Sequence, residues 1–130
     1  MIRSGYWSRS GFTLIELIAV LAMLAVLASL SLPRFVEVDA TASRQALVSS
    51  VAELNSRENL TWTQVKLSAA GWIDDAGVFS QVDTNLGSGF RWAPPAAIDG
   101  GRLGFKSESI QLERRSSTAD RSGNWKAKSE

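Results

Sequence analysis

Apolar residues fill positions 12–32 almost without a break, and this run is the strongest pattern in the chain. Within it only four positions are polar, namely Thr13, Glu16, Ser29 and Ser31, and none is Gly or Pro. As a helix the run is about 32 Å long, which is enough to cross the hydrocarbon core of a bilayer. Because lipid offers the backbone no hydrogen-bond partners, a single spanning segment has to be helical. We therefore predict a transmembrane helix over residues 12–32.

Beyond Pro33 the pattern changes to one apolar stripe at helical spacing, formed by Val36, Ala40, Leu47, Val51 and Leu54. Charged side chains fall largely outside this stripe. Proline lacks an N–H and crowds the preceding turn, so Pro33 predicts a bend in the helix and not necessarily its end. The pattern predicts one long bent helix over residues 12–59, apolar all round in its first half and amphipathic in its second.

A second, short helix is predicted over residues 62–70. Thr61 and Gln64 fit a capping box, and apolar residues on either side of it form a hydrophobic staple. Gly71 is the residue type that ends a helix in a left-handed conformation. The two aspartates at positions 74–75 then predict a turn or a helix cap.

From residue 87 onward, glycines, prolines and short alternating runs replace the helical pattern. Apolar and polar positions alternate in three places, as in half-buried strands: residues 90–92, 103–105 and 110–112. Residues 99–101 and 122–124 have the composition of turns, and the second returns Trp125 toward the sheet. Pro94 and Pro95 confine their strand to a sheet edge. We predict an α+β fold in which three or four antiparallel strands pack on the amphipathic half of the long helix.

Four tryptophans lie beyond residue 11: Trp62, Trp72, Trp92 and Trp125. Such a set can form a stacking platform for carbohydrate or nucleotide rings. A small domain without cysteine also needs large side chains to bury enough apolar area, and aromatics supply the most per residue. We expect these side chains to serve the core.

Composition narrows the range of functions. The chain has 130 residues with 14 basic and 13 acidic side chains, no cysteine and no histidine. It is long enough for one domain, has no disulfide chemistry and lacks the commonest general base and metal ligand. No nucleophile motif, phosphate loop or Rossmann glycine pattern is present, so we predict no enzyme and no cofactor. The net charge of +1 does not suggest a nucleic-acid binder.

Asp74, Asp75 and Asp83 supply oxygen atoms close together in the sequence, as calcium ligands do. The spacing lacks the calcium-loop pattern, and adjacent aspartates are common in solvated turns. We therefore assign no metal to them.

Glu16 is the one charged residue inside the apolar run. A carboxylate near the middle of a membrane costs about 2.5 to 3.5 kcal/mol, and somewhat less toward the interface. A charged residue retained at such a cost usually has an interaction partner and a function. The alternative is an interfacial glutamate that lies close enough to the membrane surface to stay solvated.

A short basic leader ends in Gly11, and the run that follows opens with Phe12, Thr13, Leu14, Ile15 and Glu16 and is followed by Pro33. These first 35 residues resemble the class III signal sequence of type IV pilins and type II secretion pseudopilins. The resemblance implies that a prepilin peptidase cuts after Gly11 and methylates the new amino terminus at Phe12. It also implies that Glu16 is the assembly residue and Pro33 the helix kink. In a fibre of parallel helices, the Glu16 carboxylate can meet the charged amino terminus of a neighbouring subunit, where low dielectric makes the attraction large.

The resemblance further implies a pilin-like structural subunit in three parts. These are a cytoplasmic leader over residues 1–11, a transmembrane and polymerisation helix over residues 12–32, and a periplasmic globular domain over residues 33–130. Arg3 and Arg9 agree with this orientation, since positively charged flanks tend to stay in the cytoplasm.

The implied location is the bacterial inner membrane, followed by a type IV pilus or a type II secretion pseudopilus. The implied partners are the prepilin peptidase, other pilin or pseudopilin subunits, and the inner-membrane assembly machinery, with no nucleic acid expected. The absence of cysteine departs from the many major pilins that close a carboxyl-terminal loop with a disulfide.

Two alternatives stay open at this point. Residues 26–28 resemble an ordinary secretory cleavage site after an apolar stretch, although that interpretation leaves Glu16 unexplained. The helix can also serve only as an anchor for a periplasmic binding module or an enzyme.

Charge is uneven in the part of the chain expected to be exported. Residues 34–101 carry five basic and eight acidic side chains, whereas residues 102–130 carry seven basic and four acidic ones. In a helical array this can align the basic end of one subunit with the acidic flank of the next, and reversing Arg114 and Arg115 would test it. The alternative is ordinary surface charge.

Overall fold

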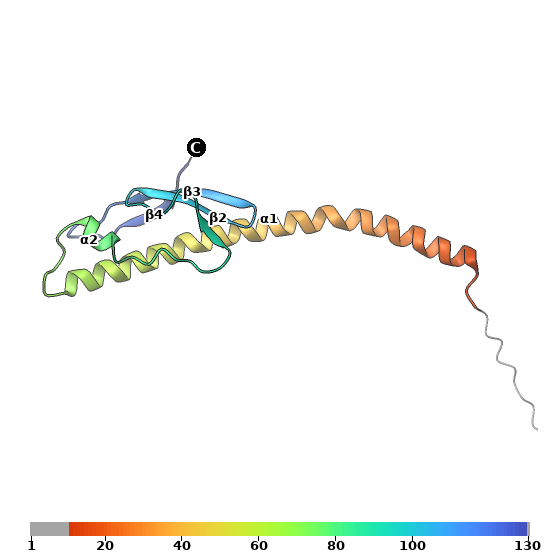
Figure 1. Ribbon diagram of the computed structural model, residues 1–130, viewed down its shortest axis with the longest axis horizontal. Helices are drawn as coiled ribbons and strands as arrows, with labels where there is room; N and C mark the ends of the chain where they lie inside the picture. The colour runs from red at the N-terminus through yellow and green to blue at the C-terminus, as the bar shows by residue number, and fades with distance from the viewer. Residues whose placement is uncertain (1–10, 130) are drawn as a thin grey trace, which may run out of the picture. The chain divides into compact units, whose positions relative to one another are not determined.

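The computed structural model describes residues 11–129, apart from the side chain of Leu32 (Figure 1). Its elements in chain order are the helices α1 (Leu14–Leu67) and α2 (Asp75–Phe79), followed by the strands β1 (Phe90–Trp92), β2 (Gly100–Phe105), β3 (Glu108–Arg115) and β4 (Asn124–Ala127). A long amino-terminal helix with one antiparallel sheet is the α+β, pilin-like class predicted above. All but the last residue of the predicted leader lies outside the described residues.

Helix α1 is one continuous helix of 54 residues that contains Pro33. The helix therefore continues past the proline, as predicted from the apolar stripe beyond it. The chain divides into two compact units, Met1–Glu37 and Val38–Glu130, so the second half of α1 belongs to the unit that contains the sheet.

The predicted start of a second helix after Thr61 is wrong, because α1 runs without interruption to Leu67. Neither Gly nor Pro occurs between residues 34 and 70, and the Thr63 hydroxyl donates to the Asn59 carbonyl at 2.8 Å, a bond made within a helix interior. The predicted left-handed conformation of Gly71 is confirmed by its φ of 67°. The helix itself ends earlier, at Leu67, and Gly71 closes the turn that follows by donating its N–H to the Ser68 carbonyl.

The sheet has the strand order β1-β2-β3-β4, with every neighbouring pair antiparallel. The register places Leu103 opposite Ile110 and Arg114 opposite Trp125. Ala93 separates Pro94 and Pro95 from β1, which is an edge strand, as predicted from these two prolines.

The turn predicted at residues 122–124 is wrong, because the chain reverses between Thr118 and Arg121, which form an isolated bridge. Gly123 instead leads into β4 and is buried, and a Cβ there would collide with the Glu58 carboxylate. The turn predicted at residues 99–101 is nearly correct. Ala97 and Gly100 bridge it, and β2 already begins at Gly100.

The core lies between the second half of α1 and the inner face of the sheet, which lies along one side of that helix in Figure 1. It consists of Leu47, Leu54, Leu103, Leu112 and Trp125. Trp92 packs against it, with its ring 5.8 Å from that of Trp125.

Core packing is thus confirmed for Trp92 and Trp125. Trp62 and Trp72 are only half-buried and lie outside the core cluster. Their indole N–H groups donate to the Thr118 carbonyl and the Ser117 hydroxyl, so they hold the loop before β4.

Candidate functional site

The amino-terminal end of α1 is closed by a capping box between Thr13 and Glu16. The Thr13 backbone N–H and hydroxyl donate to Glu16 Oε2 at 2.8 and 2.9 Å, and the Glu16 N–H donates back to the Thr13 hydroxyl at 3.3 Å. This capping box was not predicted, although its threonine-x-x-glutamate signal stands at the start of the apolar run, whereas the one predicted at Thr61 does not form. Glu16 therefore satisfies the helix terminus of its own chain.

Gly11 and Phe12 lie outside the helix, directly before this cap. Phe12 is 87% exposed. A Cβ added at Gly11 would meet no atom within 4 Å, and its backbone is not in the left-handed region. The fold therefore places no demand for glycine at this position.

The first half of α1 presents apolar side chains all round. Residues such as Leu14, Ile15 and Met23 are 68–76% exposed, and no part of the most apolar window is buried. That window has a mean hydropathy of 2.5, which makes α1 long and apolar enough to cross a membrane by length and composition.

The four polar side chains of this half all make hydrogen bonds within the helix. Thr13 and Glu16 bond each other, while the hydroxyls of Ser29 and Ser31 donate to carbonyls of the preceding turn at 2.7 and 2.9 Å. Internal satisfaction of this kind is what lipid, or an apolar neighbouring helix, requires.

A second polar cluster lies in the other unit, around Arg114. Its guanidinium donates to both oxygens of Glu58 at 3.1 and 2.5 Å, to both oxygens of Asp75 at 2.7 and 2.8 Å, and to the Ile98 carbonyl at 3.0 Å. The side chains of Arg114 and Glu58 have no exposed surface, and that of Asp75 is 14% exposed. The sequence-based treatment of Arg114 as a surface charge is therefore wrong.

Burial alone acts to raise the pKa of Asp75 and to lower that of Arg114. Hydrogen bonds from Arg114 and Ser117 outweigh burial and hold the pKa of Asp75 well below its ordinary range. Asp75 and Glu58 likewise keep the pKa of Arg114 above its ordinary value. Both groups therefore stay charged at neutral pH.

This cluster joins every layer of the domain. Glu58 lies on α1, Asp75 on α2 and Arg114 on β3, while Trp125 of β4 donates its indole N–H to Glu58 at 3.1 Å. The cluster ties together segments that lie 56 and 39 residues apart in a chain without cysteine. Its donors and acceptors are taken up by one another, so it is a structural cluster and not a binding site.

The three aspartates considered as metal ligands point to separate partners. Asp75 binds Arg114, Asp74 accepts from the Gly77 N–H at the start of α2, and Asp83 pairs with Arg57 at 3.4 Å. Within residues 11–129 no group of acidic side chains is arranged to hold a metal ion.

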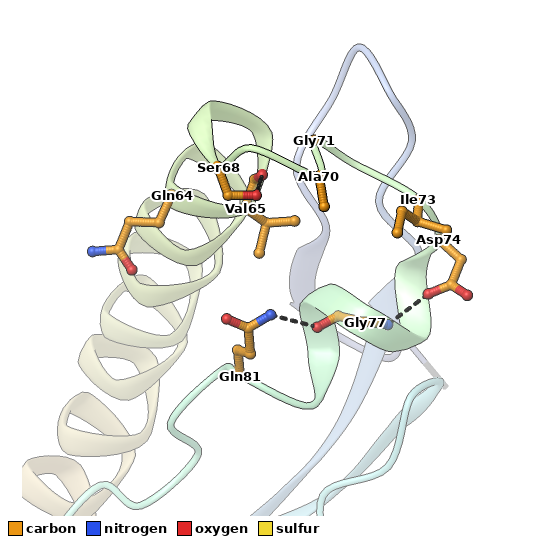
Figure 2. Close-up of a pocket in the computed structure, with 9 residues that line it drawn as sticks. All are labelled: Gln64, Val65, Ser68, Ala70, Gly71, Ile73, Asp74, Gly77 and Gln81. Atoms are coloured by element: carbon orange, nitrogen blue, oxygen red, sulfur yellow. Dashed lines mark hydrogen bonds between the residues drawn. The ribbon is translucent and has the colours of Figure 1, made fainter.

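Figure 2 shows a shallow pocket of about 230 Å³ between the end of α1 and α2. Two of its polar side chains bond within α2 and the turn that follows: Asp74 accepts from the Gly77 N–H at 2.7 Å, and the Gln81 amide donates to the Gly77 carbonyl at 3.1 Å. Apolar side chains such as Val65 and Ile73 form much of the lining. The lining residues contain no nucleophile beside a base, so the pocket holds no set of catalytic groups.

One family model matches the amino-terminal segment of the chain. Residues 8–32 match the model of the prokaryotic N-terminal methylation motif, the signal of type IV pilins and pseudopilins. No curated protein and no solved structure matches the chain. The resemblance drawn from Gly11, Phe12 and Glu16 is thereby confirmed, and the chain combines this signal with a pilin-like α+β fold.

Proposed function

We propose that this chain is the precursor of a structural subunit of a type IV pilus or type II secretion pseudopilus. In this account a prepilin peptidase cuts after Gly11 and methylates Phe12. Residues 12–32 hold the product in the inner membrane, with the sheet domain in the periplasm, and assembly machinery draws it into a fibre of like subunits. The observation that carries the proposal is the methylation motif at residues 8–32, which includes an exposed and predominantly apolar stretch of α1.

The surroundings of Gly11 support processing at that position. Because the fold leaves open space around this residue, a requirement for glycine there has to come from an enzyme that approaches the backbone closely. Gly11 lies two residues before the capping box, in a segment that is neither helix nor strand. An extended, accessible segment is the form in which a peptidase binds its substrate.

The capping box supports a role for Glu16 before and during assembly. In the single chain, hydrogen bonds from Thr13 and the positive end of the helix dipole lower the cost of a carboxylate in lipid. Cleavage after Gly11 creates a charged amine at Phe12, the residue next to Thr13. In the fibre the carboxylate of one subunit then pairs with this amine on a neighbour.

Replacing Gly11 by valine tests the processing step. The Gly11→Val chain should retain residues 1–11, because the side chain obstructs the peptidase while leaving the fold unchanged. The measurement is intact mass after expression beside a prepilin peptidase. Gly5→Val, the same change elsewhere in the leader, should be cut normally, and a Gly11→Val chain that still loses its first 11 residues would rule the proposal out.

The alternative of a membrane-anchored binding module gains no support from the tryptophans. Trp125 is 1% exposed and Trp92 packs against the core. The indole N–H groups of Trp62 and Trp72 are bonded to the loop before β4. The described chain therefore presents no exposed tryptophan platform on one face.

A further inference from the structure

Exposed apolar side chains gather where α1 ends. Leu67, the last residue of the helix, is 81% exposed. Leu60 lies seven residues earlier, on the same side of the helix, and is 61% exposed. Ile73, between α1 and α2, is 72% exposed. Because apolar side chains gain free energy when they leave water, a group of them on a folded domain marks a contact surface.

The pocket of Figure 2 opens beside these side chains. Gln64 lines it and lies between Leu60 and Leu67 on the surface of the helix. Figure 2 shows Val65 and Ala70 directed into the space between α1 and α2. The volume of this pocket is about 230 Å³, and an apolar cavity of about 150 Å³ already holds a benzene ring. The pocket is therefore large enough for one aromatic side chain.

The chain has an aromatic side chain that lacks an apolar environment. Among the aromatic residues within 11–129, only Phe12 and Phe35 are more than half exposed. Phe12 belongs to the apolar run, whereas Phe35 lies three residues beyond its end and is 72% exposed. In the membrane this position falls at the boundary between lipid and water. Drawing the helix into a fibre removes it from lipid and leaves Phe35 in water unless a neighbour covers it.

The charges next to these two features are opposite. Arg34 directly precedes Phe35, and Asp74 lines the pocket. Within residues 11–129 neither Arg34 nor Asp74 takes part in an ion pair. Asp74 Oδ1 accepts from the Gly77 N–H at 2.7 Å, which leaves its second oxygen for a cation. A chain that places Phe35 in the pocket can thus pair Arg34 with this carboxylate.

The aromatic ring has to come from another copy of the chain. Helix α1 is continuous from Leu14 to Leu67, so it holds the Phe35 of one chain away from the pocket beyond its own carboxyl end. A contact between two different surfaces is heterologous, and each copy keeps one of the two surfaces free for the next copy. Such a contact repeats in one direction, as a fibre requires.

We propose that in the fibre the Phe35 ring of one copy occupies the pocket between α1 and α2 of another copy, with Arg34 paired to Asp74. This inference rests on the proposed function and adds to it a contact outside residues 12–32. Pairing of Glu16 with the Phe12 amine joins the apolar helices, whereas the Phe35 contact joins one helix to the folded domain of a neighbour.

Cross-linking of subunits tests the contact, because the chain has no cysteine of its own. Ser31 lies one turn before Phe35 on the same side of the helix, and Ser68 lines the pocket. The variant Ser31→Cys with Ser68→Cys would replace wild type in its native cells, and sheared fibres would be treated with a short bismaleimide. Because every copy carries both thiols, a denaturing gel should show a ladder from dimers to long multimers.

A second cysteine pair is the control for this experiment. Ser31→Cys with Ser109→Cys places the second thiol on an exposed serine of β3, outside the pocket. Fibres of this variant should give single subunits on the same gel. Each cysteine alone should also give single subunits, since the contact joins two different surfaces.

Replacing Phe35 in the Ser31→Cys and Ser68→Cys chain tests the ring itself. Phe35→Ser should lower the fraction of subunits in multimers by about tenfold or more, because burial of the ring is lost. Val36→Ser is the matched control, since Val36 has the same exposed fraction of 72% but faces another side of the helix. The ladder of the Val36→Ser chain should be unchanged.

A double-mutant cycle tests the charge pair. Arg34→Gln and Asp74→Asn each remove one charge, and asparagine keeps the cap of α2. Each change alone should lower the fraction of subunits in multimers by about two- to fivefold. The two together should lose no more than either one, whereas losses that multiply would show that these groups do not meet.

Fibres that give no ladder would overturn the inference. So would dimers formed by Ser68→Cys alone, which would show two pockets facing each other, and an equal loss of the ladder in Phe35→Ser and Val36→Ser. Because fibres form in each of these cases, the proposed function would stand. A chain that keeps residues 1–11 and enters no fibre would instead contradict the proposed function, and this inference with it.

Discussion

Two side chains carry charge in places where charge is costly, and each is stabilised by hydrogen bonds in place of water. Glu16 lies at the start of an apolar helix and accepts from the backbone and hydroxyl of Thr13. Arg114, with no exposed side-chain surface, donates five hydrogen bonds to Glu58, Asp75 and Ile98. The first arrangement can be exchanged for a partner in a fibre, whereas the second fixes the domain.

Removing the charge of Glu16 without disturbing the cap tests its role in assembly. Glutamine also serves in a capping box, so Glu16→Gln should leave the helix and leader removal unchanged. Incorporation into sheared fibres should fall by roughly tenfold or more, because the amine of Phe12 loses its ionic partner. Thr13→Ala is the matched control, since it breaks the cap but keeps the charge, and it should still enter fibres. Normal incorporation of Glu16→Gln would refute the pairing.

Replacing Arg114 tests the structural cluster. Arg114→Met leaves the carboxylates of Glu58 and Asp75 without a cation and should lower the free energy of unfolding by about 3 to 5 kcal/mol. The measurement is urea unfolding of the full chain in detergent, followed by tryptophan fluorescence. The exposed neighbour gives the control, since Arg115→Met should change stability by less than about 0.5 kcal/mol. Equal effects of the two changes would contradict the burial of Arg114.

Asp75 predicts a pH dependence with a definite sign. Its pKa is depressed in the folded chain, so its contribution is complete above the ordinary aspartate value of about 3.9 and is lost as the pH falls below it. Wild type should therefore be more stable than Asp75→Asn by a constant amount above about pH 5, and this difference should shrink toward pH 3. If the stability difference between wild type and Asp75→Asn grew as the pH fell, the result would contradict a depressed pKa for Asp75.

At the scale of elements, the continuity of α1 to Leu67 is the main departure from the sequence-based expectation. The pattern at Thr61 and Gln64 is a valid cap locally, but a cap forms only where the preceding backbone leaves the helix. No Gly or Pro interrupts residues 34–70, so the helix continues and buries Leu54 and Glu58 on the same face. Local sequence signals alone cannot decide whether a new helix starts after Thr61 or the existing helix continues through it.

A proline at Thr63 distinguishes one helix from two. In the first turn of a separate helix proline is tolerated, whereas inside a continuous helix it should cost about 3 kcal/mol. We expect Thr63→Pro to destabilise the domain by that amount relative to Thr63→Ala, measured by urea unfolding of the full chain. Because Thr63 is exposed, lost packing would not explain the difference, and equal stability of the two variants would favour two helices.

At the scale of the whole molecule, local patterns predicted most of the fold and the amino-terminal methylation motif. The helix and strand periods and the segment from Gly11 to Glu16 are contiguous in the sequence, so they could be recognised there. The Arg114 cluster could not, since its partners lie 56 and 39 residues away in the sequence and nothing local distinguishes a buried arginine from a surface one. The reversal at Thr118 was missed for a similar reason, because the glycine at 123 is needed for close approach to Glu58 and not for a turn.

The intact mass of the protein extracted from its native membrane tests the central claim most directly. If the chain is a prepilin, the mass should correspond to residues 12–130 with one added methyl group on the Phe12 amine. A full-length chain with the leader in place would contradict the account. So would a product cut after residues 26–28, because that cut removes Glu16 together with most of the apolar helix.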